Sequence, residues 1–355
     1  MHNTRCIYYR NTSCMANRRR MLCHYIKIYV THLQKYVKTS LVQNFVGHLT
    51  INNMKKILIS LLFVLVSAVS ANAQLLYRVS GADLKKPSYV FGTFHFANSP
   101  FVDQVAGVRQ ALDATDQVYG ELNFDVMLNP DSMQVMQKHM LLPEGKTLKT
   151  VLTPEQYKKL DAVLVDYMGV GLSNPMVAQQ MGKMSPATLL TQLMVLQYLK
   201  AHMGEFDPTN LIDQYFQKQA KQNNEPVGGL ETLSFQASLL YGAPLKRQIQ
   251  QLDCFLNNLD YYAQFTERMV KAYYAQDVKA LLDLMNEKFN TTCDSTPEEM
   301  AQLLDNRNLD WASRMPAIMK AAPTLFVVGA GHLPGSKGVL KLLQEKGYTV
   351  EAVKP

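Results

Sequence analysis

Residues 324–332 read Thr-Leu-Phe-Val-Val-Gly-Ala-Gly-His, and this stretch decides the expected fold. Its first part, through Val328, is a continuous apolar run of strand length, which is typical of a strand buried on both faces of a parallel sheet. The run ends at Gly329, and glycine allows the sharp turn that would bring His332 back over the sheet edge. The stretch therefore predicts a buried strand with a histidine just beyond its carboxyl end.

Residues 88–95 repeat this arrangement near the other end of the chain, where Ser-Tyr-Val-Phe precedes Gly92 and His95 follows three residues after that glycine. In an open parallel sheet, functional groups gather outside the carboxyl ends of the strands. Two histidines on nearby strands could share one metal ion through neutral ring nitrogens. A single Gly-x-x-His occurs often by chance and is more simply a structural histidine, but two copies after the most strand-like segments predict a functional site.

Strands are expected at both ends of the chain and helices between them. The expected strands cover 76–79 and 88–92 (a hairpin), 117–122, 324–329 and 348–353, with a short strand signal at 225–229. The expected helices, from apolar spacings of three and four, cover 131–141, 154–169, 175–203, 208–222, 232–242, 245–275, 277–288 and 297–320. These elements predict an α/β fold: a mixed, largely parallel central sheet built from both ends of the mature chain, with a large helical insertion at about 130–320.

Three charged residues are candidates for the same site. Glu121 follows the strand that ends near Gly120, where an unpaired charge is costly to bury, and it is expected to be a metal ligand or general base. The alternative is a solvent-facing glutamate past the strand end. Glu231 precedes a helix and is either a further metal ligand or a glutamate favoured by the helix dipole. Arg307 either holds a carboxylate ligand or stabilises an oxyanion, or it is an exposed helix arginine beside Asp305.

Residues 54–73 have the pattern of a secretory signal peptide. A Met-Lys-Lys start precedes an apolar run over 57–69, and Ala-Asn-Ala at 71–73 gives a signal peptidase site. The run is short for a membrane span, so we expect export to the periplasm or the extracellular space without a stable membrane anchor; an uncleaved anchor is the alternative. Residues 1–53 precede a complete signal peptide and are interpreted as an extension from a misplaced start codon.

The basic charge belongs to the same leader. The 355-residue chain has a net charge of +7, but residues 1–73 hold ten Lys or Arg and no Asp or Glu, which leaves −3 for 74–355. We therefore expect no nucleic-acid partner. Two cysteines, Cys254 and Cys293, lie outside the leader. In an oxidising compartment they are predicted to form a disulfide, because a thiol metal site would need closer spacing or neighbouring histidines.

These residues together resemble the TraB/GumN family, which also includes the Tiki metalloproteases of animals. The resemblance spans nearly all of residues 75–353. It rests on 89–95, Glu121, Gly229-Leu230-Glu231-Thr232 with Gln236, Arg307-Asn308 with Trp311, and 327–333 through Gly347-Tyr348. Motifs of other hydrolases and nucleotide-binding proteins, such as G-x-S-x-G, H-E-x-x-H and the P-loop, do not occur in the sequence.

The resemblance implies that residues 74–355 form one TraB/GumN-like domain with a helical insertion. It also implies a site in which His95, His332 and Glu121 form the centre and Glu231 and Arg307 support it. Tiki-like members are peptidases that depend on divalent metals, so manganese or cobalt is expected, with zinc as a further possibility. The sequence thus predicts an exported metal-dependent hydrolase acting on a peptide or protein. The alternatives are a non-catalytic haem- or metal-binding protein of the cell envelope and an esterase-like relative.

Overall fold

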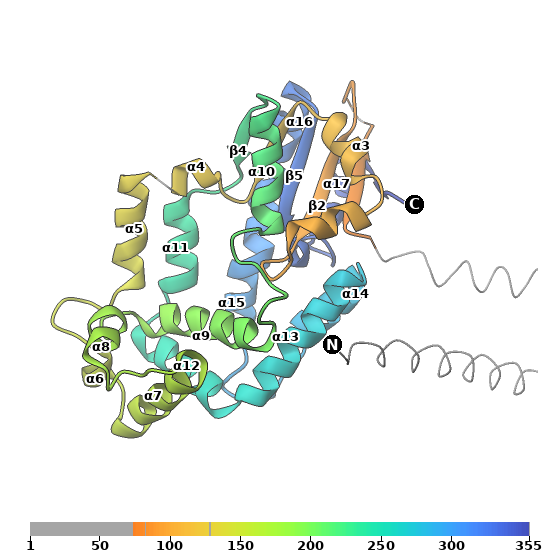
Figure 1. Cartoon of the computed structure of the whole chain (residues 1–355). Helices are drawn as coiled ribbons and strands as arrows, with labels where there is room; N and C mark the ends of the chain where they lie inside the picture. Colours follow the sequence, from red (N-terminus) through yellow and green to blue (C-terminus); the bar gives the residue numbers. More distant parts are fainter. Residues whose placement is uncertain (1–73, 82, 128, 355) are drawn as a thin grey trace, which may run out of the picture. The chain divides into compact units, whose positions relative to one another are not determined.

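The computed structural model describes residues 74–354 except 82 and 128 (Figure 1). The signal peptide expected at 54–73 and the extension expected at 1–53 lie outside these residues. The described part contains a six-stranded sheet in the order β4-β3-β5-β2-β1-β6. Its strands are β1 (Leu76–Ser80), β2 (Ser88–Thr93), β3 (Gln117–Gly120), β4 (Val227–Gly229), β5 (Thr324–Gly329) and β6 (Thr349–Ala352).

The sheet is mixed and mostly parallel, which confirms the predicted fold class. Strands β2, β5, β3 and β4 run parallel to one another, whereas β1 pairs antiparallel with both β2 and β6. In this register Thr93 pairs with Gly329, and Val327 pairs with Gly120. The carboxyl ends of β2, β3 and β5 therefore meet at one edge, and the segments that follow them carry His95, Glu121 and His332.

Strand β5 lies at the centre of the sheet because its side chains are apolar on both faces. Leu325, Phe326 and Val328 are fully buried. Helices α3 (Val108–Asp113), α10 (Ile212–Gln222), α13 (Leu259–Tyr274), α14 (Val278–Met285), α16 (Asn306–Ala321) and α17 (Val339–Glu345) contribute to the same core. This packing fixes the edge of the sheet on which the candidate site lies.

A second hydrophobic core lies within the helical part of the chain. It draws on residues between Leu142 and Leu256. Its helices are α6 (Leu148–Val151), α7 (Pro154–Met168), α8 (Pro175–Met181), α9 (Pro186–Ala201) and α12 (Leu245–Asn257). Between the two cores, α4 (Phe124–Met127), α5 (Pro130–Met140) and α11 (Leu233–Tyr241) follow β3 and β4 (Figure 1). The insertion is thus a packed helical unit with its own apolar interior.

Three of the predicted helices are divided. The helix expected at 175–203 is α8 and α9, because Ser185 caps a new helix and Pro186 occupies its first turn. The helix expected at 245–275 breaks at Asn258, which ends α12 and begins α13. The helix expected at 297–320 consists of α15 (Pro297–Met300), the π-helical turn η2 (Ala301–Asp305) and α16.

The predicted disulfide between Cys254 and Cys293 is present in the structure. It joins α12 to the loop that follows α14. Within the described part of the chain, no helix combines the length and the apolar character that a membrane crossing requires.

Candidate functional site

A cavity of about 470 Å³ lies at the edge where β2, β3 and β5 end. Its polar lining includes His95, Glu121, Asp213, Gln236, Arg307 and His332. The rest of its wall is mostly apolar and includes Phe94, Leu211, Met269, Leu281, Met285 and Leu303. Residues from both ends of the chain and from the insertion therefore surround one space.

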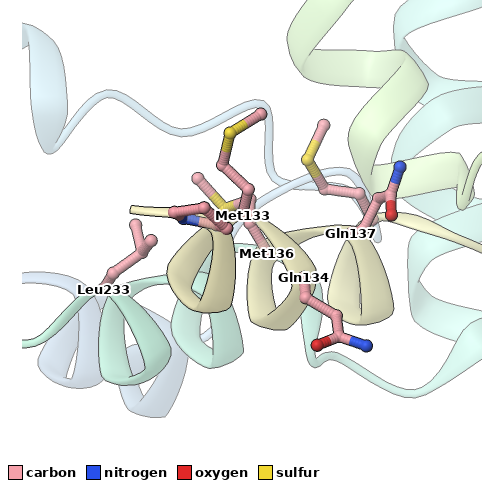
Figure 2. Close-up of a pocket in the computed structure, with 7 residues that line it drawn as sticks. Met133, Gln134, Met136, Gln137 and Leu233 are labelled. Atoms are coloured by element: carbon pink, nitrogen blue, oxygen red, sulfur yellow. The ribbon is translucent and has the colours of Figure 1, made fainter. Parts of the chain in front are cut away.

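A second hollow, of about 530 Å³, lies along α5 and reaches α11 (Figure 2). It is lined by Pro130, Met133, Gln134, Met136, Gln137, Met140 and Leu233. None of these side chains titrates or is a strong metal ligand. Acid–base or metal chemistry therefore belongs to the cavity at the sheet edge and not to this hollow.

Glu121 comes directly after β3, and both of its carboxylate oxygens are engaged. Oε1 accepts a hydrogen bond from the backbone N–H of Gly329 at 2.7 Å. Oε2 accepts from Arg307 at 2.6 Å and from Gln236 at 3.1 Å. Burial would raise the pKa of Glu121, but this pKa is lowered overall, and the charge of Arg307 and the hydrogen bond from the Gly329 amide contribute to the lowering. The carboxylate is therefore held as an anion at the edge of the cavity.

The glycines of the two Gly-x-x-His segments allow neighbouring side chains to lie close to the backbone. The sequence suggested that they supply special backbone angles, but neither Gly92 nor Gly329 has a positive φ. A Cβ on Gly92 would lie 2.7 Å from Leu333 Cδ1, and a Cβ on Gly329 would lie 3.2 Å from Glu121 Oε1. The missing side chain at Gly329 thus lets the Glu121 carboxylate reach the backbone N–H of this residue.

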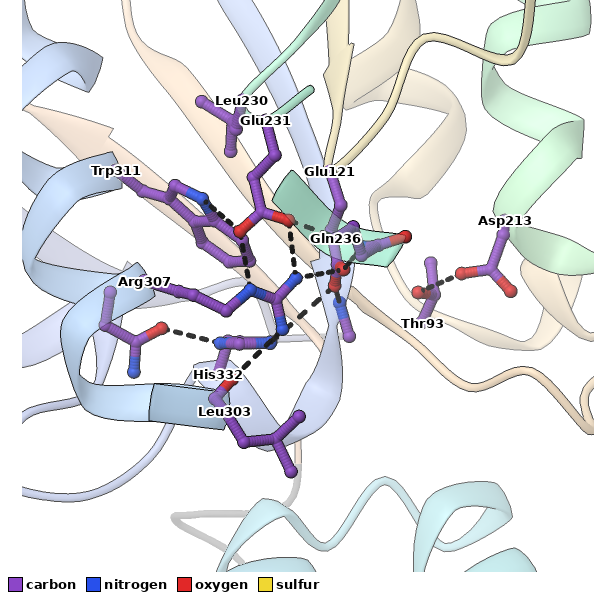
Figure 3. A network of polar contacts seen from close by, with 12 residues as sticks. Thr93, Glu121, Asp213, Leu230, Glu231, Gln236, Leu303, Arg307, Trp311 and His332 are labelled. Carbon is purple, nitrogen blue, oxygen red and sulfur yellow. Dashed lines mark hydrogen bonds and ion pairs between the residues drawn. The ribbon is translucent and has the colours of Figure 1, made fainter. Parts of the chain in front are cut away.

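Arg307 binds two carboxylates at once (Figure 3). Besides its bond to Glu121, it donates to Glu231 through Nε at 2.5 Å and Nη2 at 3.0 Å, a bidentate pair. Its side chain is only 5% exposed. One cation faces two carboxylates here, so the cluster carries net negative charge while both glutamates are ionised. Such a cluster favours an additional cation nearby.

The π-helical turn Ala301–Asp305 comes just before Arg307 and helps to place it. The carbonyl of Leu303 accepts a hydrogen bond from Arg307 Nη1 at 3.0 Å. The guanidinium also lies 4.7 Å from the centre of the Trp311 ring, one turn later on α16. Turns of π-helix are often found at functional sites. Arg307 is consequently a fixed part of the site.

Glu231 lies behind Arg307 and does not line the cavity. Its side chain is 2% exposed, and it accepts further hydrogen bonds from Trp311 Nε1 at 3.1 Å and Gln236 Nε2 at 3.3 Å. Burial raises its pKa, and the bonds from Arg307 and Trp311 only partly oppose this. These contacts favour a supporting role for Glu231 over direct ligation.

His332 is buried and neutral. Its Nδ1 lies 2.7 Å from Asn308 Oδ1, and its Nε2 lies 3.0 Å from Arg307 Nη1. An arginine N–H can only donate, so Nε2 accepts and Nδ1 carries the proton. Burial first, and then the charge of Arg307, lower the pKa of His332 to about 4. The lone pair of Nε2 is therefore directed toward the charged cluster, 3.8 Å from Glu121 Oε1.

His95 differs from His332 in its surroundings. Its side chain is 79% exposed, and its Nδ1 lies 3.0 Å from Asp213 Oδ2. The other oxygen of Asp213 accepts from Thr93 Oγ1 at 2.5 Å. The charge of Asp213 and its hydrogen bond raise the pKa of His95 to about 9. Asp213 was not among the residues predicted from the sequence, where an aspartate in the first turn of a helix reads only as a dipole partner.

The donor set fits a divalent cation in its chemistry. Two imidazole nitrogens and a carboxylate suit manganese, cobalt or zinc. His95 uses only Nδ1 in hydrogen bonding among the described residues, which leaves Nε2 for a ligand once the ring has lost its second proton. At His332 an ion would replace the hydrogen bond from Arg307. In the part of the chain that the structure describes, no three His, Cys, Asp or Glu side chains are already gathered tightly around one point.

Several known proteins are similar in sequence to this chain. Metalloprotease TIKI1 of Danio rerio is 25% identical over 304 residues, covering 75% of this chain and 60% of that protein. Metalloprotease TIKI2 of Danio rerio is 24% identical over 309 residues, covering 76% of this chain and 59% of that protein. The Metalloprotease TIKI homolog of Nematostella vectensis is 22% identical over 313 residues, covering 76% of this chain and 65% of that protein. The chain thus spans about three fifths of the length of these relatives.

A family model gives the broader relationship. The model described as the TraB/PrgY/gumN family matches residues 75–352, which include every strand of the sheet and all of the candidate site. This agrees with the resemblance seen in the sequence. The chain belongs to the TraB/PrgY/gumN family.

Proposed function

We propose that the chain is an exported, metal-dependent hydrolase of peptide bonds, with its reaction centre in the cavity at the sheet edge. The observation that carries the proposal is the convergence of His95, Glu121 and His332 on that one cavity from the ends of three neighbouring strands. The similarity to Tiki metalloproteases supports the reaction class. Export rests on the signal-peptide pattern at 54–73.

In this proposal His95, His332 and Glu121 hold the cation. His332 suits the role because it is already neutral, and imidazole ligates through a free lone pair. Glu121 suits it because a lowered pKa keeps the carboxylate charged. A bound divalent cation supplies a Lewis acid that polarises the scissile carbonyl and acidifies the attacking water. A lowered pKa also makes Glu121 a weak base, so we assign it ligation ahead of proton abstraction.

Arg307 and Glu231 hold the Glu121 carboxylate in position. Arg307 fixes Oε2 of Glu121, and Glu231 fixes the guanidinium through two hydrogen bonds. Gln236 donates to both glutamates and so keeps their carboxylates side by side. Groups held in this way need little rearrangement when the substrate binds, which is the usual advantage of a preorganised site.

The wall of the cavity indicates the kind of substrate. Met269 on α13, Leu281 and Met285 on α14, and Leu303 in η2 contribute apolar side chains to the lining of the cavity. Methionine side chains adapt to ligands of different shape. We propose a peptide that places an apolar side chain against this wall, next to the bond that is cleaved.

The test is hydrolysis of a peptide library by the purified mature chain. Activity should disappear with a chelator and return with Mn²⁺ or Co²⁺. It should be lost in His95→Ala and His332→Ala but retained in the control His139→Ala, whose histidine lies on α5 away from the cavity. A chain that shows a Soret band and no hydrolysis would instead be a haem-binding protein. Chelator-resistant cleavage of esters alone would point to an esterase.

A further inference from the structure

We propose that Asp213 is a positioning residue that orients the His95 ring so that Nε2 faces the cavity. Its consequence for catalysis rests on the proposed function, but the orientation itself is a property of the metal-free chain. Asp213 lies in the first turn of α10, a helix of the insertion, whereas His95 follows β2. The proposal therefore links the inserted helices to the sheet-edge site.

Both oxygens of the Asp213 carboxylate form hydrogen bonds with side chains at or just after the end of β2. Oδ2 lies 3.0 Å from His95 Nδ1, and Oδ1 lies 2.5 Å from Thr93 Oγ1 (Figure 3 shows the Thr93 contact). Thr93 is the last residue of β2 and is 2% exposed. One carboxylate thus bridges the buried end of the strand and the histidine two residues later. The Asp213 side chain is 15% exposed, so it is largely shielded from water.

Packing fixes the position of Asp213 in turn. Phe216, on the next turn of α10, is fully buried and lies 4.8 Å from Phe91 of β2, measured between ring centres. Helix α10 therefore contacts the strand that leads directly to His95. His95 is mostly exposed and has no other side-chain hydrogen bond among the described residues. The ring consequently depends on Asp213 for its orientation.

The chemistry determines which nitrogen is free. A carboxylate can only accept, so His95 Nδ1 must carry a proton and the neutral ring has its lone pair on Nε2. Histidines that ligate metals commonly use their second nitrogen in this way, with a carboxylate or carbonyl behind the ring. His332 has the same arrangement, with Asn308 Oδ1 in place of the carboxylate. Both histidines of the site therefore present Nε2.

The direct test is the tautomer of His95 in the metal-free protein, read from imidazole ¹H–¹⁵N correlation spectra at a pH where the ring is neutral. We expect the Nδ1–H form in the wild type. Asp213→Asn keeps an acceptor of the same shape and should keep this form, as Asn308 does for His332. Asp213→Ala should shift His95 to the Nε2–H form that free histidine favours, while the His332 signals stay unchanged. Persistence of the Nδ1–H form in Asp213→Ala would overturn the proposal.

The binding consequence is measured by titrating each variant with Co²⁺ alone. Loss of a carboxylate behind a ligating histidine commonly weakens metal binding about 10–100-fold, and we expect this for Asp213→Ala. The matched control is Asp260→Ala, which replaces an exposed aspartate in the first turn of α13 and should bind Co²⁺ as the wild type does. Unchanged Co²⁺ affinity in Asp213→Ala would contradict the role. Because the tautomer is measured without metal or substrate, a failure of the proposed hydrolase function would leave that result standing.

Discussion

Arg307 Nη1 lies 3.0 Å from His332 Nε2, the nitrogen that this histidine would offer to a metal ion. The same guanidinium binds Glu121 and Glu231, so it neutralises part of the charge that would attract a cation. Binding of an ion would therefore exchange one hydrogen bond at His332 for a ligand bond. The Glu121 carboxylate would stay in place, because Gly329 and Gln236 also donate hydrogen bonds to it.

Arg307→Met should destabilise the fold strongly. The substitution leaves two largely buried carboxylates without their cation, and removal of one partner from a buried ion pair typically costs about 3–5 kcal/mol. The free energy of unfolding from chemical denaturation measures this. Arg109→Met is the control, since Arg109 forms an exposed pair with Asp103, which is expected to contribute about 1 kcal/mol or less. Equal losses of unfolding free energy in the two variants would contradict a stabilising role for the buried ion pairs of Arg307.

Glu121→Gln and Glu231→Gln should separate ligation from support. Glu121 lines the cavity and Glu231 does not. We expect Glu121→Gln to lose bound metal and, with it, most of the hydrolysis that depends on the metal. Glu231→Gln should keep the metal but lower stability by about 1–3 kcal/mol, since it weakens a buried charged hydrogen bond. Metal analysis and denaturation of both variants decide this. Metal loss in Glu231→Gln alone would reverse the two assignments.

The metal-free protein should lose stability on mild acidification because of His332. Burial lowers the pKa of His332 to about 4, whereas an unfolded histidine titrates at about 6.5. Between these values the unfolded chain binds a proton that the folded chain does not, so stability falls as the pH decreases through this window. The loss is on the order of 3 kcal/mol. Denaturation at several pH values should show a shallower dependence in His332→Gln, and identical slopes would contradict the assignment.

The disulfide should stabilise the chain by restricting the unfolded state. Cys254 and Cys293 are 39 residues apart in sequence. Closure of a loop of this length contributes about 3–4 kcal/mol in the chain-entropy account. Cys293→Ala should therefore lower the free energy of unfolding by that amount, and a reductant should then have no further effect. A wild type that is equally stable with and without reductant would rule this out.

Much of the sheet could be predicted from the sequence, because its strands are short apolar runs bounded by glycine and polar residues. The strand predicted at 324–329 has the same bounds as β5 in the structure. The helix breaks were harder to predict. Ser185-Pro186 is a recognisable helix start that the apolar spacing obscured, whereas Asn258 interrupts a pattern that continues on both sides.

Some residues of the candidate site could likewise be predicted from the sequence and others could not. His95, His332 and Glu121 could be found because each follows a strand-like run, and parallel strands end at a shared edge. Asp213 and Asn308 could not be given roles, because each acts through a tertiary contact with a residue that is distant in sequence. Its local sequence alone left Arg307 between a surface arginine and a carboxylate holder, and its burial and its ion pairs with Glu121 and Glu231 favour the second.

The most direct test of the account is calorimetric titration with Co²⁺ of the wild type, His95→Ala, His332→Ala and the control His139→Ala, with circular dichroism to confirm folding. The account predicts a single ion per chain in the wild type and the control. It also predicts affinity weaker by about tenfold or more in each of the other two variants, with unchanged helical content. Wild-type affinity in both His95→Ala and His332→Ala would contradict the claim that the two histidines share one metal site.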